Sequence, residues 1–572
     1  MATTTTTPLT AQEAARFLNQ ATMGFNSADL ALLMQQGYEG WIAQQFAITQ
    51  DHVPGHHKWL SAYYPPGPNT DVNGAALFVN SVLRRCAEGK DLLRQKMAFA
   101  LSQILVVSGR ADHVHNYRHI AMGSYMDLLA TYSFDRYPDL LAAVGRTALM
   151  ANYLTFLGSK KTADGNAPDE NYAREVQQLF TIGVDVLDIA TGLPVAVPGS
   201  NPVRYEEAYT SADIRKIAKL FTGFQAFGQT DLVDYYSPEK GYGLTQVVPN
   251  DAETLTEDLV INYPYYEAGV KKTYTVKVSK DLTGHARINS FADQLAQHPA
   301  VGFFLARQLI QRFVTSNPSA AYVRRVGQAY YRIDSTTGKA HNLGAMVKAI
   351  LMDESLFVSG KRTGGLEVAN QDFGRVREPF ARLTQWVRLF GAQSVSGRWN
   401  AGTHASTPDN QSKFSQSPLM AKSVFNFYRP NFVYPGGVET RLAAPTPEQV
   451  WGGKRVAPEL QLVNEYTSLT YISTIWKTLD SAQYVSGTSG GVGGARDIVS
   501  SYSAWTAKAS NPTMLVAELN LMLASGRINK TACDKVIQAI SSMAGSNETD
   551  RRLRVQAAAF LLMIAPEYIV QK

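Results

Sequence analysis

Cysteine is nearly absent from this chain. Its 572 residues include two cysteines, Cys86 and Cys533. Two thiols cannot build the disulfide framework of a small secreted scaffold, and they are too few for a metal cluster held by thiolates. Both classes of protein are therefore excluded. Whether the two cysteines pair with each other stays open, because sequence spacing does not determine connectivity.

Basic blocks and long apolar runs are also lacking. Lys and Arg number 54 against 48 Asp and Glu, and no basic block is longer than a few residues. This distribution argues against nucleic acid as a partner. The longest apolar runs, such as 557–565, are far shorter than the ~20 residues of a membrane-spanning helix, so no membrane span is predicted.

The chain is rich in apolar residues at helical spacing. Hydrophobic residues make up 45% of it and charged residues 18%, as in an ordered globular protein. Helical spacing recurs in about a dozen segments, such as 90–108 and 300–332. Two helix starts carry capping-box signals, Thr10 with Glu13 and Asn26 with Asp29. The sequence therefore predicts a mainly α fold, a multi-helix globular array.

One stretch breaks the helical pattern. Residues 273–278 alternate between apolar and polar, and residues 259–263 form a second short strand candidate. A small β insertion at about 227–283 is therefore predicted, as a hairpin or a meander.

The chain exceeds the size at which one core stops growing, so several subdomains are expected. No signal peptide is visible at its start, where the basic and apolar regions of such a peptide are lacking. The predicted organisation is a flexible leader (1–9), an N-terminal helical lobe (10–226), the β-containing insertion (227–283), a central helical lobe (284–390), a long polar loop (391–422), and a C-terminal helical lobe (423–572) with a Gly-rich loop at 486–495.

The most informative segment is 168–183. Pro168 near its start and Gly183 at its end predict a helix of about four turns at 3.6 residues each. Its apolar stripe overlaps its charged residues rather than opposing them, so we expect a buried helix whose polar groups are paired.

The charged residues of this helix fall at contact spacing. Glu170 and Arg174 are four apart, as are Asn171 and Glu175, so each pair can touch along one side of the helix. Two interpretations stay open. The group is a hydrogen-bonded network that locks helices together, or it is a ligand site in which Arg174 clamps an anion and Glu175, with Glu170, acts as acid or base.

Nine segments, taken in order, resemble a bacterial family catalogued as domain of unknown function 1800. They are 15–25, 168–175, 220–224, 298–302 with 307–312, 314–318, 377–379, 417–418, 423–430 and 565–568. The family brings no established activity with it. Its members usually bear export signals and often stand beside exported proteins that look like sulfatases. The resemblance therefore implies a periplasmic or extracellular location.

Histidines offer the nearest approach to a metal site. His115 and His119 are four apart, so on a helix both could face one divalent ion. A convincing third ligand is missing, and exposed histidines at a loop-to-helix junction explain the spacing better. No metal and no cofactor is predicted.

Aromatic residues gather with one arginine in 423–435. Such a segment either lines a groove for a sugar or a polymer, or packs as a turn between helical lobes. Both interpretations stay open.

Taken together, these features predict a central cleft that binds an anionic or polyhydroxylated ligand such as a polysaccharide. Its expected lining is the 168–183 helix with His298, Arg307, Arg312 and Arg377, because arginines suit an anion. Whether the ligand is also hydrolysed stays open. The rival interpretation is a non-catalytic accessory or assembly protein that docks an exported partner protein through apolar surface.

Overall fold

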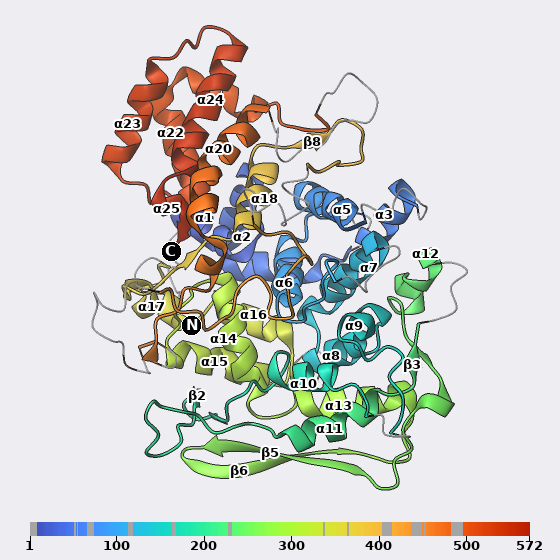
Figure 1. The fold of residues 1–572 in the computed structure, drawn as a ribbon. Helices are drawn as coiled ribbons and strands as arrows, with labels where there is room; N and C mark the ends of the chain where they lie inside the picture. Colours follow the sequence, from blue (N-terminus) through green and yellow to red (C-terminus); the bar gives the residue numbers. More distant parts are fainter. Residues whose placement is uncertain are drawn as a thin grey trace.

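Helices dominate the structure (Figure 1). The computed structural model describes residues 9–50, 53, 55–65, 74–111, 118–162, 167–226, 232–335, 338–362, 365–402, 415–435, 446, 449–450, 453–481 and 496–572. The predicted fold class, mainly α with a small β part, is confirmed. Most of the leader, the middle of the polar loop and the Gly-rich loop lie outside the described residues. The predicted domain boundaries stay predictions.

The first part of the chain builds one helical layer. Its helices are α1 (Ala11–Ala21), α2 (Ser27–Ala47), α3 (His56–Tyr63), α5 (Gly74–Glu88), α6 (Leu92–Ser102), α7 (Arg118–Thr131), α8 (Tyr137–Gly145) and α9 (Ala148–Tyr153). Both predicted capping boxes are present, Thr10 with Glu13 on α1 and Asn26 with Asp29 on α2. At Gly37, with φ 69°, the backbone leaves the helical conformation, and α2 then resumes. Glycine tolerates this left-handed φ.

The middle of the chain carries a second set of helices. They are α10 (Asn171–Gln178), α11 (Ser211–Ala218), α12 (Leu232–Tyr235), α13 (Gly284–Ala296), α14 (Val301–Phe313), α15 (Ala320–Tyr330), α16 (Leu343–Leu351), α17 (Leu366–Ala369) and α18 (Pro379–Leu389). Short 3-10 turns connect several of them.

Among the described residues, the strands form four small sheets. They are β1 (Leu187–Asp188), β2 (Leu193–Pro194), β3 (Phe224–Gln225), β4 (Gln246–Val247), β5 (Leu259–Glu267), β6 (Val270–Val278), β7 (Arg375–Val376), β8 (Gln393–Ser394), β9 (Ile498–Val499) and β10 (Val570–Gln571). The largest sheet has the order β2-β1-β5-β6. The others pair β10 with β7, β3 with β4, and β8 with β9.

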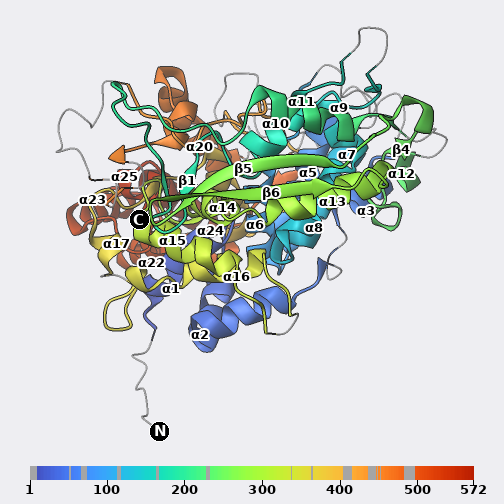
Figure 2. The same cartoon turned by 90° about the horizontal axis from the view of Figure 1, so that it is seen from below.

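The predicted strand pair is the long antiparallel hairpin β5–β6. Its register pairs Leu259 with Val278 and Glu267 with Val270. In the tight turn, Ala268 and Gly269 both have positive φ and donate their N–H groups to the Asp188 carboxylate at 3.2 and 2.8 Å. Figure 2 shows the hairpin running across the molecule with α13 beside it. There the Tyr274 hydroxyl donates to the Gln294 carbonyl at 2.8 Å.

The last part of the chain forms the red and orange lobe at the top of Figure 1. Its helices are α20 (Glu465–Ser481), α21 (Ser503–Thr506), α22 (Pro512–Ala524), α23 (Lys530–Ser541), α24 (Glu548–Met563) and α25 (Pro566–Ile569). Its last strand, β10, returns to the middle of the chain and pairs with β7. One continuous cluster of buried apolar side chains extends from Ala14 to Tyr568, so the lobes share a core.

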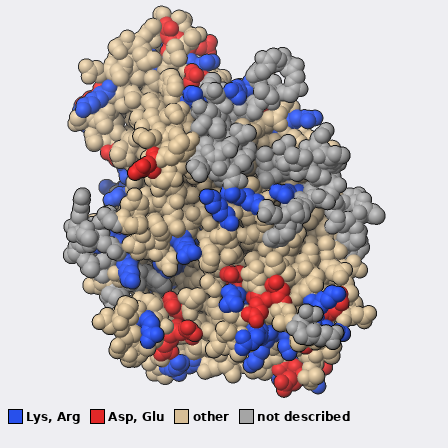
Figure 3. Space-filling model, viewed as in Figure 1, with Lys and Arg blue, Asp and Glu red and all other residues tan. Residues whose placement is uncertain are grey.

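Charged side chains are unevenly spread over the face seen in Figure 3. They gather over the lower part of this face, near the β5–β6 hairpin, whereas most of the surface of the C-terminal lobe is uncharged. No helix in the described ranges has the length and apolarity needed to cross a membrane.

Candidate functional site

The segment 168–183 forms a shorter helix than its end signals predict. The helix α10 covers Asn171–Gln178, about two turns, and the chain then bends away through residues 179–183. Its start is held by Asp169, whose carboxylate accepts the Asn171 N–H at 2.9 Å and the Thr155 hydroxyl at 2.9 Å.

The buried face of α10 is aromatic. Tyr172 is fully buried, with ring centroids 4.8 Å from Phe156 and 4.6 Å from Phe221. Gln177 accepts the Tyr263 hydroxyl at 3.0 Å, which ties the helix to β5. These contacts anchor α10 in the core.

The polar face of α10 is largely exposed, contrary to the expectation of a buried and paired network. Arg174 and Glu170 do form the predicted pair, at 3.4 Å, but their side chains are 44% and 33% exposed. Water screens such a pair, so it contributes little to stability. The Asn171 amide donates to the Thr155 hydroxyl at 3.3 Å, rather than meeting Glu175.

Glu175 differs from its neighbours because it faces inward. It is 5% exposed, and its Oε2 has no hydrogen-bond partner among the described residues. Burial raises the pKa of this carboxyl to about 7, against the opposing effect of Arg174. Burial, and after it the nearby Glu175 carboxyl, raise the pKa of the Tyr209 hydroxyl to about 12.

A pocket of about 300 Å³ lies next to the C-terminal end of α10, where α14 faces the aromatic segment 424–431. We call it the arginine pocket. Its lining consists of Gln103, Ile104, Gln178, Leu179, Ile182, Gly183, Val184, Asp185, Leu187, Phe304, Arg307, Gln308, Arg312, Val424, Phe425, Tyr428, Arg429, Pro430 and Asn431. Three of these residues are arginines, whereas Asp185 is the one acid of this lining.

Two of the arginines project from α14. Arg307 donates to the Pro430 carbonyl at 3.4 Å, and burial lowers its pKa to about 10 although Asp185 acts against that shift. Arg312 donates to the carbonyls of Gln308 and Gln103 at 2.9 and 3.0 Å. The Arg312 Nε has no hydrogen-bond partner in the part of the chain that the structure describes.

Arg429 completes the set from the opposite wall. It is exposed, and its guanidinium lies 4.6 Å from the centroid of the Phe425 ring. The backbone N–H of Arg429 donates to the Gln461 side chain at 2.6 Å, which holds this segment in place.

The one acidic residue of the lining responds to both its surroundings and a neighbouring arginine. Burial raises the pKa of the Asp185 carboxyl, while Arg307 lowers it.

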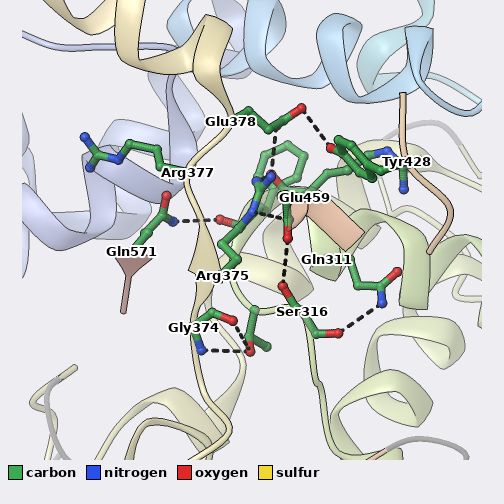
Figure 4. Close-up of polar contacts among 12 residues, drawn as sticks. Gln311, Ser316, Gly374, Arg375, Arg377, Glu378, Tyr428, Glu459 and Gln571 are labelled. Atoms are coloured by element: carbon green, nitrogen blue, oxygen red, sulfur yellow. Dashed lines mark hydrogen bonds and ion pairs between the residues drawn. The ribbon is translucent and has the colours of Figure 1, made fainter. Parts of the chain in front are cut away.

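A buried ionic network supports one side of the pocket (Figure 4). The Tyr428 hydroxyl lies 2.8 Å from Glu378 Oε1 and 2.9 Å from Gln103 Oε1. Glu378 pairs with Arg375 at 2.9 Å, and Arg375 pairs with Glu459 at 3.0 Å. Burial opposes ionisation of Glu378, but Arg375 and then Lys96 lower its pKa to about 2. The network therefore holds Tyr428 and Gln103 in fixed positions.

His298 lies outside the pocket lining. Its Nδ1 accepts the Ala300 N–H at 3.1 Å, and its ring packs edge-on against Tyr263, Tyr265 and Tyr274 of the hairpin. Burial lowers its pKa to about 3, so the imidazole is neutral. In this environment His298 packs the hairpin onto the helices.

Arg377 also lies elsewhere. It donates to the Asn19 side chain at 2.7 Å and to the Gln385 side chain, and it stacks 4.8 Å from the centroid of the Tyr568 ring. These contacts join α1 to α18 and α25.

The structure thus brings two of the eight predicted site residues, Arg307 and Arg312, into the pocket lining. The other six, Glu170, Asn171, Arg174, Glu175, His298 and Arg377, do not line it. The aromatic segment contributes a wall of the pocket through residues of 424–431.

Sequence reasoning missed Asp185 and Gln103. Asp185 follows the predicted helix by two residues. Its position in the sequence does not indicate that it lies beside arginines from another helix. Gln103 lies at the C-cap of α6, 68 residues before the first residue of α10, Asn171, and only packing brings the two together.

The remaining predictions concern histidines and cysteines. His119 is fully buried, with its Nε2 2.8 Å from the Tyr64 carbonyl, so the expectation of an exposed histidine is wrong there. His115 lies outside the described residues. Among the described residues, no group of three or more His, Cys, Asp or Glu could hold a metal ion. Cys86 and Cys533 are both free thiols, so the disulfide that the sequence left undecided is not formed.

Comparison with known proteins identifies the family. The family described as Protein of unknown function (DUF1800) matches residues 16–570, nearly the whole chain. The chain belongs to this family, as its sequence motifs indicate. No curated protein and no solved structure matches the chain.

Proposed function

We propose that this member of the DUF1800 family binds an anionic ligand with an apolar part in the arginine pocket. The observation that carries the proposal is that Arg307 and Arg312, both on α14, line a pocket that has one acidic residue in its lining. Guanidinium groups bind carboxylates, sulfates and phosphates through paired hydrogen bonds.

The partial desolvation of Arg307 supports an anion over a neutral ligand. Its lowered pKa means that the surrounding protein disfavours the charged form. An anion bound against this guanidinium would restore the electrostatic stabilisation that water no longer supplies.

The walls and size of the pocket define the rest of the ligand. Leu179, Ile182, Phe304 and Phe425 give it an apolar side, and its volume is about 300 Å³. That volume is at the small end for ligand pockets, so it suits a small molecule or one acidic residue of a polymer. A sulfated or carboxylated polysaccharide would place one of its acidic sugar residues in the pocket.

The proposal is for binding and does not extend to hydrolysis. A glycosidase needs two carboxyl groups on opposite sides of the scissile bond. Asp185 is the one carboxyl group of the pocket lining, and Glu170 and Glu175 lie outside it. The location implied by the family resemblance, periplasmic or extracellular, belongs to the proposal and is tested by cell fractionation of the native producer.

Isothermal titration calorimetry with glucuronate, glucose 6-sulfate and glucose tests the proposal. The two anions should bind and glucose should not. In Arg307→Gln, loss of a charge-assisted hydrogen bond of about 1.5–3 kcal/mol should weaken anion binding about 10-fold or more. Arg174→Gln is the matched control, because this arginine is exposed and outside the pocket. Equal anion affinity in the two variants, or no anion binding, would refute the proposal.

A second candidate function, docking of an exported partner protein, is favoured by one observation. Tyr466, Leu469, Ile472 and Trp476 recur at helical spacing on α20, and all four are exposed. They lie on the C-terminal lobe, which carries little charge on the face in Figure 3. A photo-crosslinker at position 469 should capture one protein in cells, and Ile472→Lys should abolish the adduct. An adduct that is insensitive to this substitution would contradict docking through this stripe.

A further inference from the structure

A second, much smaller cavity lies behind the arginine pocket, on the other side of Glu378. Its volume is about 20 Å³, and it is lined by three cationic side chains, Lys96, Arg375 and Arg377, together with Glu378. Its polar lining also includes Asn19 and Gln571, from the two ends of the chain, together with Thr22 and Gln385. The cavity therefore lies where α1, α6, β7 and β10 meet.

Lys96 is the unusual member of this cavity. It is 4% exposed, and within the described ranges its ammonium has neither a hydrogen-bond acceptor nor a carboxylate at ion-pair distance. Its one close contact of note is the Phe313 ring, whose centroid is 5.5 Å from Nζ. An ammonium with no direct acceptor is costly in such a site, so a charged Lys96 gains stability when a further acceptor enters the cavity, beside the longer-range attraction of Glu378 and Glu459.

The neighbouring carboxylates are committed to other groups. Glu378 and Glu459 both pair with Arg375, and Glu378 Oε1 accepts further hydrogen bonds from Gln103 and Gln416 at 2.6 and 2.8 Å. Figure 4 shows this arrangement around Arg375.

Arg377 adds to the positive charge. It donates to the neutral side chains of Asn19 and Gln385 and has no carboxylate partner among the described residues. Three cations thus meet two carboxylates, Glu378 and Glu459, which leaves one positive charge in excess around the cavity. Burial lowers the pKa of Lys96 to about 7, Arg375 acts in the same direction, and Glu378 opposes the shift.

We propose that this cavity binds one small monovalent anion of the halide class, with chloride as the occupant. The volume supports a single small species, because one water molecule requires about 10–15 Å³ by the same measure. Polyatomic oxyanions are larger. An anion here would offset this excess positive charge and would also accept hydrogen bonds from the neighbouring side chains.

The position of the cavity predicts what the anion does. It would hold together Asn19 on α1, Lys96 on α6, Arg377 before α18 and Gln571 on β10, elements from both ends of the chain. Because the site requires the folded arrangement, binding should stabilise the folded state in proportion to the logarithm of chloride concentration above the Kd.

Two measurements test the inference. Chloride is exchanged for gluconate at constant ionic strength, and the thermal midpoint is expected to rise by about 1–2 °C per tenfold increase in chloride. Lys96→Met, which keeps the length of the side chain without its charge, should abolish this dependence. The control Lys348→Met should retain it, because Lys348 is 47% exposed on α16.

Crystals grown in bromide supply the independent measurement, in the unaltered protein. An anomalous bromide peak beside Lys96 Nζ is expected. Ordered water without bromide in the cavity would overturn the inference, as would a thermal midpoint that does not respond to chloride. If Lys96→Met fails to fold, the bromide peak decides. Neither result depends on ligand binding in the arginine pocket, so the two proposals fail separately.

Discussion

Glu175→Gln tests what the inward-facing carboxyl of α10 does. An exposed glutamate has a pKa of 4.5, and burial raises that of Glu175 to about 7. The folded state therefore binds this proton more tightly than the unfolded state. Its contribution to stability is present below pH 4.5 and is lost as the pH rises through about 7.

The magnitude follows from the pKa shift. A shift from 4.5 to about 7 corresponds to about 3 kcal/mol, which we reduce to roughly 2 kcal/mol for solvent screening. Glutamine has a similar shape and no charge to desolvate. The variant should therefore be more stable than the parent by roughly 2 kcal/mol above pH 8, and by less than about 1 kcal/mol near pH 5.

Urea unfolding of the variant and the parent at pH 5 and pH 8.5 provides the measurement. Glu170→Gln is the matched control, because this carboxyl is partly exposed on the same helix and should show little dependence on pH. A loss of several kcal/mol for Glu175→Gln at pH 8.5 would refute the reasoning. It would mean that a buried cation depends on the Glu175 carboxylate.

Three further predictions concern other parts of the molecule. Glu378→Gln should lower the free energy of unfolding, measured with denaturant, by about 3–5 kcal/mol, because Arg375 loses one of its two buried carboxylates. In the parent, the lowered pKa of Glu378 predicts a loss of stability as the pH falls from 4.5 towards about 2. Arg174→Ala should change stability by less than about 0.5 kcal/mol, since its ion pair is exposed. A large thermal shift would contradict this. Ala268→Asn should raise stability by about 0.5–1 kcal/mol, because Ala268 has φ 50° in the hairpin turn and asparagine tolerates that conformation better; a lower urea midpoint would count against it.

The sequence by itself determined the local elements. The capping boxes at Thr10 and Asn26 and the alternating stretch at 273–278 form where they were predicted. So does the contact between Glu170 and Arg174. Each depends on residues within one or two turns, or within one hairpin, so periodicity and capping chemistry are sufficient.

Burial of the polar residues was decided by packing. The same helix exposes Arg174 and buries Glu175, although the two are adjacent in sequence and both charged. The helical period indicates which residues share a face, but the neighbours that cover a face come from elsewhere in the chain. Here they include Phe156 and Phe221, which pack on Tyr172.

The arginine pocket shows the same limit. Arg307 and Arg312 were predicted as anion-binding residues from their type, and the pocket places them opposite Arg429 and beside Gln103. In the supporting network, Arg375 and Glu378 are three residues apart, whereas Glu459 reaches Arg375 from 84 positions away. Such contacts depend on how the helices stack, and only the tertiary structure decides that.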